Sequence, residues 1–236
     1  MNCKAPFDVL LVTLLVSGVI LGIGSPLPAA EQGDLLLTAQ AASGELAGWK
    51  AFLEDPGAKV GDVWRLADGV LTCRGTPKGY LYTEKDYGDF VLTLDWRWPP
   101  SKQPGKGGVL IRTTGPDKIW PKSLEAQINA PDAGDFWGLD GYRLQGPADR
   151  LQTIEQSAFG RLTNLKKTAA VEKPAGQWNH YEIRAQGDTV TLTINGRIVN
   201  QATGCEPSSG KICLTSEGDE IQMRNVRVSP ISGVKQ

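Results

Sequence analysis

The sequence is poor in histidine and cysteine and has no run of basic residues. Histidine occurs once, at His180, and the four cysteines include no CxxC pair. This scarcity argues against a metal cluster or a catalytic thiol, because such sites draw on closely spaced ligands or a cysteine–histidine pair. Lysine plus arginine number 25 against 26 aspartates and glutamates. Without a basic block, nucleic acid is not an expected partner.

Long apolar runs are missing after the first thirty residues. The early run from Val9 to Ile23 follows Lys4 and precedes the small residues of SPLPAAEQ. This order is typical of a secretory signal peptide, expected over residues 1–30 with cleavage after Ala30; an uncleaved anchor is the alternative. The run is short for a membrane span, and no later segment is apolar enough to cross a bilayer. The sequence predicts an exported protein, periplasmic or extracellular, with no membrane contact beyond the signal peptide.

An odd number of cysteines remains after the expected cleavage, namely Cys73, Cys205 and Cys213. In an exported protein this count predicts one disulfide and one free thiol, or no bridge at all. Cys205 and Cys213 flank a turn-rich segment and could close a small loop. The pairing is therefore left open.

Segments with a helical period are few, whereas short alternating segments punctuated by glycine and proline are many. QSAFGRLTNLKK is at best one short helical turn, while Asp68-Gly69 and Asn195-Gly196 are strong hairpin signals. After a lead-in over residues 31–47, we expect an all-β domain over residues 48–232. Two antiparallel sheets forming a sandwich or jelly roll are the expected architecture.

The region from about Pro131 to Gly176 departs from this strand rhythm and is expected to be a long loop. Such loops in compact domains are often lids or binding loops. Trp137 and Tyr142 lie within it. Their rings could stack on a sugar, or they could plug one end of the sandwich.

Apolar and polar residues alternate over KSLEAQINA, residues 122–130, which is the pattern of a half-buried strand. The apolar set faces the core, and the polar set includes Glu125, Gln127 and Asn129. Taken alone, a polar strand face is more often solvated surface. A ligand cleft is the alternative.

Several motifs occur in an order that resembles the 3-keto-disaccharide hydrolase domain family, formerly a domain of unknown function. From about Gly48 to Pro230 these are GDVWRLADGVLTCRG, GYLYTEKDYGDFVLTLDWRW, GGVLIRT, LEAQI, PAGQWNHYEIRAQGDTVTLTINGRIV and SEGDEIQMRNVRV. The resemblance implies a concanavalin A-like sandwich whose concave sheet face holds carbohydrate. It also implies cleavage of glycosides that have been oxidised at C3 of the sugar. Glu217 stands where many relatives carry histidine.

A ketone at C3 acidifies the hydrogen at C2, so a base can start an elimination that breaks the glycosidic bond. Water can then add to the resulting enone. Such a site needs a base and a hydrogen-bonding or positive group for the enolate oxygen. No cofactor is certain, and a divalent metal ion could serve as the electrophile. A 3-keto-glycoside is the expected partner, and the oligomeric state is left open.

The candidate residues lie on strands that would form one polar patch if those strands neighbour each other. Glu125 and Glu217 are candidates for base or metal ligand, with Arg112 stabilising negative charge. The candidates for holding the sugar are Asp95, Arg97, Gln127, Trp137, Tyr142 and Arg224. His180 is expected to be structural or solvent-facing.

Two other functions fit the same sandwich. A non-catalytic carbohydrate-binding or scaffold module would bind sugar without turnover, and Asp95 and Arg97 would then be a surface charge ladder. A retaining β-glucanase needs two carboxylates at close range on one strand. Gln127 and Asn129 follow Glu125 in phase, which argues against the glucanase.

Overall fold

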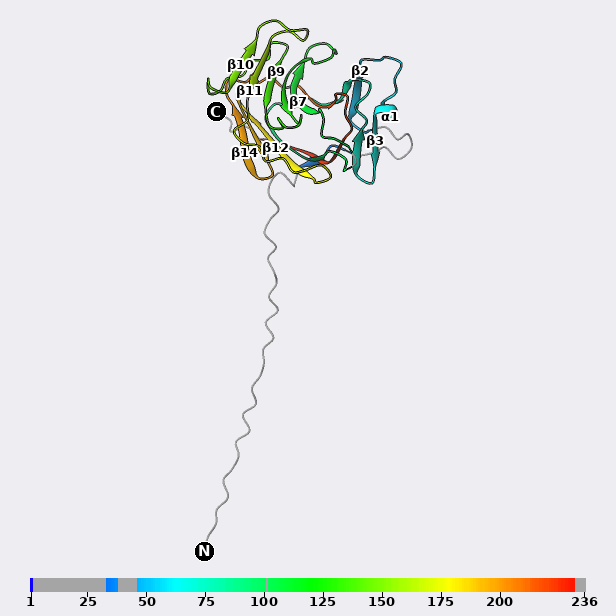
Figure 1. Ribbon diagram of the computed structural model, residues 1–236, viewed down its shortest axis with the longest axis vertical. Coiled ribbons are helices and arrows are strands. Elements are labelled where there is room, and N and C mark those ends of the chain that lie inside the picture. The colour runs from blue at the N-terminus through cyan, green and yellow to red at the C-terminus, as the bar shows by residue number, and fades with distance from the viewer. Residues whose placement is uncertain (2–32, 38–45, 101, 232–236) are drawn as a thin grey trace.

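The alternating segments form two antiparallel sheets that pack face to face, as the computed structural model of the chain shows (Figure 1). The structure describes residues 1, 33–37, 46–100 and 102–231. The expected signal peptide lies outside the described residues, apart from Met1. Among the residues that are described, no helix has the length and apolarity needed to span a membrane.

The first sheet, sheet I, has the strand order β14-β13-β12-β6-β16-β4-β3, and β1 pairs with β16. Its strands are β1 (Asp34–Leu35), β3 (Trp64–Ala67), β4 (Val70–Cys73), β6 (Phe90–Arg97), β12 (Asn179–Gln186), β13 (Thr189–Ile194), β14 (Arg197–Ala202) and β16 (Ile221–Pro230).

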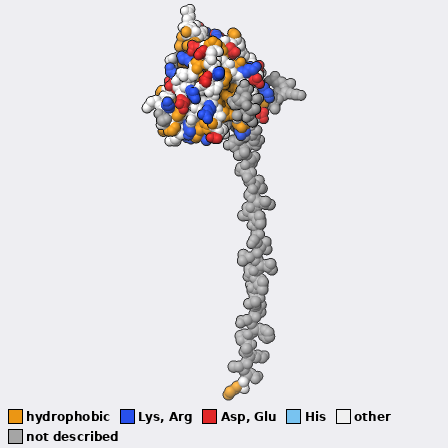
Figure 2. Space-filling model, turned by 90° about the vertical axis from the view of Figure 1, so that its right-hand side faces the viewer, with side chains coloured by type: hydrophobic (Ala, Val, Ile, Leu, Met, Phe, Trp, Pro, Cys, Tyr) orange, Lys and Arg blue, Asp and Glu red, His pale blue; other side chains and the backbone are white. Residues whose placement is uncertain are grey.

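The second sheet, sheet II, has the order β10-β11-β9-β8-β7-β15-β5-β2. Its strands are β2 (Trp49–Leu53), β5 (Gly79–Thr83), β7 (Gly108–Thr114), β8 (Lys122–Gln127), β9 (Phe136–Leu139), β10 (Leu151–Ile154), β11 (Leu162–Leu165) and β15 (Lys211–Ser216). One short helix, α1 (Val60–Val63), precedes β3. On the face that carries β2, β3 and α1, side chains of both charges are interspersed (Figure 2).

The core lies between the two sheets and is built from the apolar phase of each strand. Phe90 and Trp96 of β6, and Trp98 just after it, belong to this core, since all three are fully buried. The ring of Trp96 meets that of Trp98 edge-on, with 5.8 Å between centroids. Such edge contacts between aromatic rings add to the hydrophobic stabilisation of the core.

Both predicted hairpins are confirmed, and their turns require a left-handed backbone. Asp68 and Gly69 join β3 to β4 with φ of 51° and 74°. Asn195 and Gly196 join β13 to β14 with φ of 51° and 79°. Asparagine, aspartate and glycine tolerate this region best, which is why these pairs mark two-residue hairpins.

The expectation of a long loop over 131–176 is wrong. The segment supplies β9, β10 and β11, which extend sheet II beyond β8. Leu162–Leu165, expected at best as a helical turn, is β11, pairing with both β9 and β10. These strands have four residues each, too few for an alternating pattern to stand out, and long-range pairing holds them in place.

The sequence leaves the pairing of the cysteines open, and the structure agrees with the alternative that has no bridge among Cys73, Cys205 and Cys213. Cys73, Cys205 and Cys213 are free and buried. The Cys213 thiol donates to Thr113 Oγ1 over 3.4 Å. Burial raises the pKa of Cys73 to about 11 and those of Cys205 and Cys213 to about 12. These thiols therefore pack as small apolar groups.

Candidate functional site: a carboxyl pair on the aromatic face of sheet II

The face of sheet II that points away from the core carries a band of apolar and aromatic side chains, here called the aromatic face. Glu125 lies in this band rather than on open surface, and only 8% of the residue is exposed. Its register partners are Leu110 on β7 and Trp137 on β9. The band consists of Phe52, Tyr80, Tyr82, Leu110, Trp120, Trp137, Leu139, Leu162 and Cys213.

The Glu125 carboxyl lies directly over Gly108 of β7. A Cβ at Gly108 would stand 2.7 Å from Glu125 Oε1, so any side chain at Gly108 would displace the carboxyl. The Gly108 backbone is held by Thr215 of β15, whose hydroxyl accepts from Gly108 N–H at 2.7 Å and donates to Gly108 O at 3.1 Å. A glycine in the middle of a strand marks a place of close approach, here between a carboxyl and the backbone.

Glu217, just beyond the end of β15, continues the strand phase of Cys213 and Thr215 and brings a second carboxyl to this end of the face. Its Oε1 is buried and has no hydrogen-bond partner among the described residues. A buried acceptor without a partner is unfavourable in the free protein, so a ligand that donates a hydrogen bond to it would be favoured.

Both carboxyls have a raised pKa, and the carboxylate of Glu217 contributes to the shift of Glu125. Burial raises the pKa of Glu125 well above its usual range, and the carboxylates of Glu217 and then Asp135 raise it further. Burial also raises the pKa of Glu217, opposed by the Thr215 hydroxyl and by Lys106 and Lys78. A carboxyl pair of this kind holds one proton at pH values where ordinary carboxyls are ionised. It can therefore supply one acid and one base.

Gln127 and Trp137 lie beside the pair, as the sequence suggested. Strand alternation places the Gln127 side chain on the same face as Glu125, and Gln127 is partly buried. Trp137 stands opposite Glu125 across the β8–β9 pairing. The structure thus brings together Glu125, Glu217, Gln127 and Trp137.

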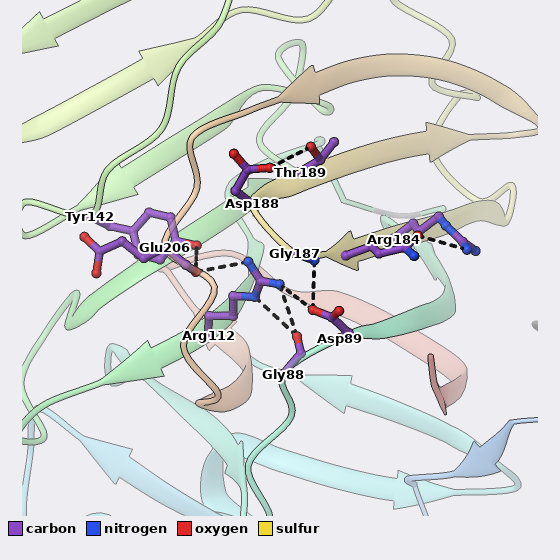
Figure 3. Close-up of polar contacts among 10 residues, drawn as sticks. Gly88, Asp89, Arg112, Tyr142, Arg184, Gly187, Asp188, Thr189 and Glu206 are labelled. Carbon is purple, nitrogen blue, oxygen red and sulfur yellow. Dashed lines mark hydrogen bonds and ion pairs between the residues drawn. The ribbon is translucent and has the colours of Figure 1, made fainter. Parts of the chain in front are cut away.

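Arg112 does not belong to this group, which corrects the expectation that it shares a face with Glu125. It occupies a bulge in β7 with φ of 51° and is 1% exposed. Its Nη1 donates to Glu206 O at 3.0 Å, and its Nη2 donates to Asp89 Oδ1 at 3.2 Å and Gly88 O at 3.3 Å (Figure 3). Arg112 therefore ties loops together inside the protein.

Tyr142 joins the same buried network. Its hydroxyl donates to Glu206 O at 3.0 Å, and the residue is 1% exposed (Figure 3). Of its two suggested roles, the structure supports packing within the sandwich. A ring buried to this degree has no free face for a sugar.

Asp95, Arg97 and Arg224 lie on the other sheet, so the predicted single polar patch is wrong. β6 neighbours β12 and β16 in sheet I, whereas β7 and β8 belong to sheet II. Arg224 Nε donates to Asp95 Oδ2 at 3.1 Å, and His180 Nδ1 lies 2.9 Å from Asp95 Oδ1. The guanidinium carbons of Arg97 and Arg224 lie 4.4 and 4.1 Å from the ring centroid of Trp178. This is a network of charged groups on the solvent side of sheet I.

His180 is half exposed, so its expected solvent-facing position is confirmed. Hydrogen bonds from His180, Asn225 and Arg224 lower the pKa of Asp95, although burial by itself would raise it. The carboxylate of Asp95 is thus fully engaged with protein partners, unlike that of Glu217.

The sequence reasoning overlooked the aromatic residues that complete the face, namely Phe52, Tyr80, Tyr82 and Trp120. A signal for two of them was present, because GYLYT places Tyr80 and Tyr82 in the same strand phase. Among the described residues, no group of three or more His, Cys, Asp or Glu side chains is arranged to hold a metal ion.

The two packed antiparallel sheets form a concanavalin A-like β-sandwich, and the family match and similar solved structures support a carbohydrate-related function. The chain matches the model of the 3-keto-alpha-glucoside-1,2-lyase-like domain over residues 42–229 and belongs to this family. This match confirms the family resemblance. No curated protein sequence matches the chain.

Solved structures at low sequence identity share the fold. A Parabacteroides distasonis protein, described only provisionally as a glycosyl hydrolase, is 21% identical with a TM-score of 0.53, covering 78% of this chain and 99% of its own. The carbohydrate-binding module CBM66 from Bacillus subtilis is 16% identical with a TM-score of 0.55, covering 77% and 95%. A Bacillus licheniformis β-glucanase is 13% identical with a TM-score of 0.52, covering 80% and 95%.

Proposed function

We propose that the protein is an exported enzyme that cleaves the glycosidic bond of 3-keto-glycosides by elimination, followed by hydration of the product. The observation that carries this proposal is the buried carboxyl pair, Glu125 and Glu217, on the aromatic face of sheet II. Family membership supplies the substrate class. Elimination next to a ketone needs a base and an acid in one site, and the pair offers both.

Glu217 is the base in this mechanism and Glu125 the acid. Lys106 and Lys78 favour the ionised form of Glu217, whereas burial and its neighbouring carboxylates favour the protonated form of Glu125. Glu217 removes the proton at C2, and the electron pair forms the enolate of the C3 ketone. As the enolate collapses, the bond between C1 and the glycosidic oxygen breaks, and Glu125 gives its proton to that oxygen. The products are an alcohol and an enone.

Hydration completes the reaction. Water adds its hydroxyl at C1 of the enone and a proton returns to C2, which regenerates the 3-keto sugar. The carboxyls have exchanged their protonation states by then, so Glu125 can accept a proton from water while Glu217 returns one to C2. Trp137 provides a ring face against which the sugar packs, and Gln127 provides hydrogen bonds to its hydroxyls.

The test is incubation of the mature chain, beginning at Glu31, with a 3-keto-disaccharide and with its unoxidised parent, each with and without a chelator. Release of a 3-keto sugar from the oxidised substrate alone is the expected result. Loss of activity on chelation would add a metal ion to the mechanism. Binding of either sugar without turnover would contradict the proposal and favour a carbohydrate-binding module.

A second experiment separates the two roles. An aryl 3-keto-glycoside has a good leaving group and needs little help from an acid. Glu125→Gln should therefore recover much of its lost rate on the aryl substrate, while Glu217→Gln should not. The opposite pattern would exchange the two roles.

Export is the remaining part of the proposal. It rests on the apolar run from Val9 to Ile23 and the small residues before Glu31. Expression of the full chain followed by cell fractionation should give a periplasmic or secreted product whose mass corresponds to cleavage after Ala30. An uncleaved product in the membrane fraction would contradict this assignment.

A further inference from the structure

A hollow of about 290 Å³ opens on the aromatic face, away from the carboxyl pair. We call it the tyrosine hollow; its lining includes Tyr80, Tyr82, Pro116, Asp117, Lys211 and Cys213. The mechanism above uses none of these residues. Cys213 and Glu217 share one strand phase and lie about 13 Å apart along β15 and its continuation. Cys213 pairs with Leu110, and Leu110 pairs with Glu125, so Glu125 is two strand spacings, about 10 Å, from Cys213. The two features therefore belong to one continuous surface.

The tyrosine rings form the apolar part of the hollow. Tyr80 is 1% exposed and packs against Phe52, with 5.4 Å between ring centroids, and against Tyr82, with 6.0 Å. Burial raises the pKa of both tyrosines, so both rings stay neutral. Tyr82 is partly exposed and leaves an aromatic surface free for a ligand.

The polar part of the hollow is Asp117 and Lys211. Asp117 is exposed and accepts a hydrogen bond from the Tyr80 hydroxyl at 3.1 Å, which leaves further acceptor positions on its carboxylate. The Lys211 ammonium lies 2.7 Å from Asp86 Oδ1 and donates to Glu84 O at 2.7 Å. Its charge is therefore already balanced, and the hollow offers no surplus positive charge to an anion.

An aromatic surface beside a carboxylate with spare acceptor positions suits a neutral ring that carries hydroxyl groups. The face of such a ligand ring packs against a tyrosine ring, and the carboxylate accepts hydrogen bonds from the ligand's hydroxyl groups. A hollow of this volume, next to a site for a sugar, fits one further sugar unit rather than a long chain.

We propose that the tyrosine hollow binds the sugar on the far side of the scissile bond, that is, the leaving group of the substrate. This inference rests on the proposed function, because it assigns the hollow a place relative to the bond that is cleaved. It makes the protein selective for 3-keto-disaccharides over 3-keto-glycosides of small alcohols. Binding energy from the leaving sugar then contributes to catalysis at the carboxyl pair.

The experiment compares kcat/KM for a 3-keto-disaccharide of two glucose units with that for methyl 3-keto-glucoside. The wild-type protein should favour the disaccharide, and Tyr82→Ala should reduce this preference about tenfold, mainly through KM, because one aromatic contact is lost. Tyr82→Phe keeps the ring and should recover most of the preference. Tyr87→Ala is the matched control, because Tyr87 packs on Phe90 outside the hollow and its loss should leave the preference unchanged.

Equal losses on both substrates in Tyr82→Ala, or an unchanged preference, would overturn the assignment while leaving the proposed function in place. If the wild-type protein turns over neither substrate, the proposed function fails, and titration calorimetry with the unoxidised disaccharide still tests the hollow. Binding that weakens in Tyr82→Ala, but not in Tyr87→Ala, would then support it as a sugar site. No binding, or equal binding by all variants, would overturn it.

Discussion

The two sheets carry carboxylates in opposite circumstances. On the solvent side of sheet I, Asp95 is surrounded by Arg224, Asn225 and His180, each within hydrogen-bonding distance. On the aromatic face of sheet II, the Glu217 carboxyl buries an oxygen with no hydrogen-bond partner among the described residues. Asp95 is thus satisfied by its protein partners, whereas the Glu217 oxygen could still accept a hydrogen bond from a ligand. Whether a carboxylate has hydrogen-bond partners in the protein is therefore a better guide to a candidate catalytic group than whether it is aspartate or glutamate.

The largest expected effect is on turnover. Glu125→Gln keeps the shape of the side chain but removes the proton that the mechanism transfers, so kcat on a 3-keto-disaccharide should fall by about 10²- to 10⁴-fold. Asp95→Asn, the matched change on sheet I, should leave kcat close to that of the wild-type protein. Steady-state kinetics on both variants, with circular dichroism to verify folding, make this comparison. Equal activity of the two variants would remove Glu125 from the mechanism.

The next effect is on stability and compares two arginines. Arg112→Met removes a buried guanidinium and leaves the carbonyls of Gly88 and Glu206 without their donor, so the free energy of unfolding should fall by about 3 kcal/mol. Arg224→Met affects a partly exposed side chain and should cost less than about 1 kcal/mol. Urea denaturation of both variants measures the difference. Similar losses would mean that the buried guanidinium of Arg112 and the partly exposed guanidinium of Arg224 do not differ as described.

A smaller effect is expected on sugar binding. Trp137→Ala should weaken binding of a 3-keto-disaccharide about tenfold, because one stacking surface beside Glu125 is lost. Trp178→Ala removes an indole just before β12 of sheet I, where Arg97 and Arg224 cover the ring, and should leave binding unchanged. Titration calorimetry in the Glu125→Gln background avoids turnover during the measurement. A loss in the Trp178 variant instead would place the sugar on sheet I.

The most subtle effect is the dependence of stability on pH, which should have opposite signs on the two faces. The pKa of Glu125 is raised, so the folded protein binds this proton more tightly than the unfolded chain does. This stabilisation is present below the unfolded pKa and is lost as the pH rises through the folded pKa. The pKa of Asp95 is lowered, so its stabilisation is present above the unfolded pKa and is lost as the pH falls through the folded pKa.

Melting temperatures of Glu125→Gln and Asp95→Asn, measured from acid to neutral pH, should separate the contributions of Glu125 and Asp95 to the pH dependence of stability. Glu125→Gln should flatten the fall of stability towards neutral pH, and Asp95→Asn should flatten the fall towards acid pH. Identical pH profiles for both variants and the wild-type protein would show that neither carboxyl is perturbed by folding.

Most strands were predictable, because apolar and polar residues alternate along them in the sequence. β8 and β6 show the core phase as uninterrupted alternation, and the hairpin turns carry their own residue signals. The neighbours of each strand were not predictable in this way. β6 and β7 are consecutive in the chain yet lie in different sheets, since pairing is decided by long-range contacts. Asp95 and Arg97 were therefore grouped with Glu125, although they lie on the outer face of sheet I and Glu125 lies on the outer face of sheet II.

Arg112 illustrates a second limit of the sequence. Simple alternation along β7 would place Arg112 in the same phase as Leu110, which is on the aromatic face. The bulge between Ile111 and Thr114, with φ of 51° at Arg112, redirects the side chain into the buried network. Nothing in GGVLIRT marks this bulge, because arginine is not a residue that favours positive φ. Glu125, by contrast, lies in a regular strand and points where the pattern predicted.

The three buried thiols have a practical consequence. Cys73 belongs to sheet I, Cys213 to sheet II, and Cys205 to neither, so a thiol-modifying reagent would find one inert target in each part of the fold. Each thiol becomes reactive only when its surroundings open. Labelling rates followed by mass spectrometry would therefore report which part of the sandwich separates first, using probes that the chain already carries.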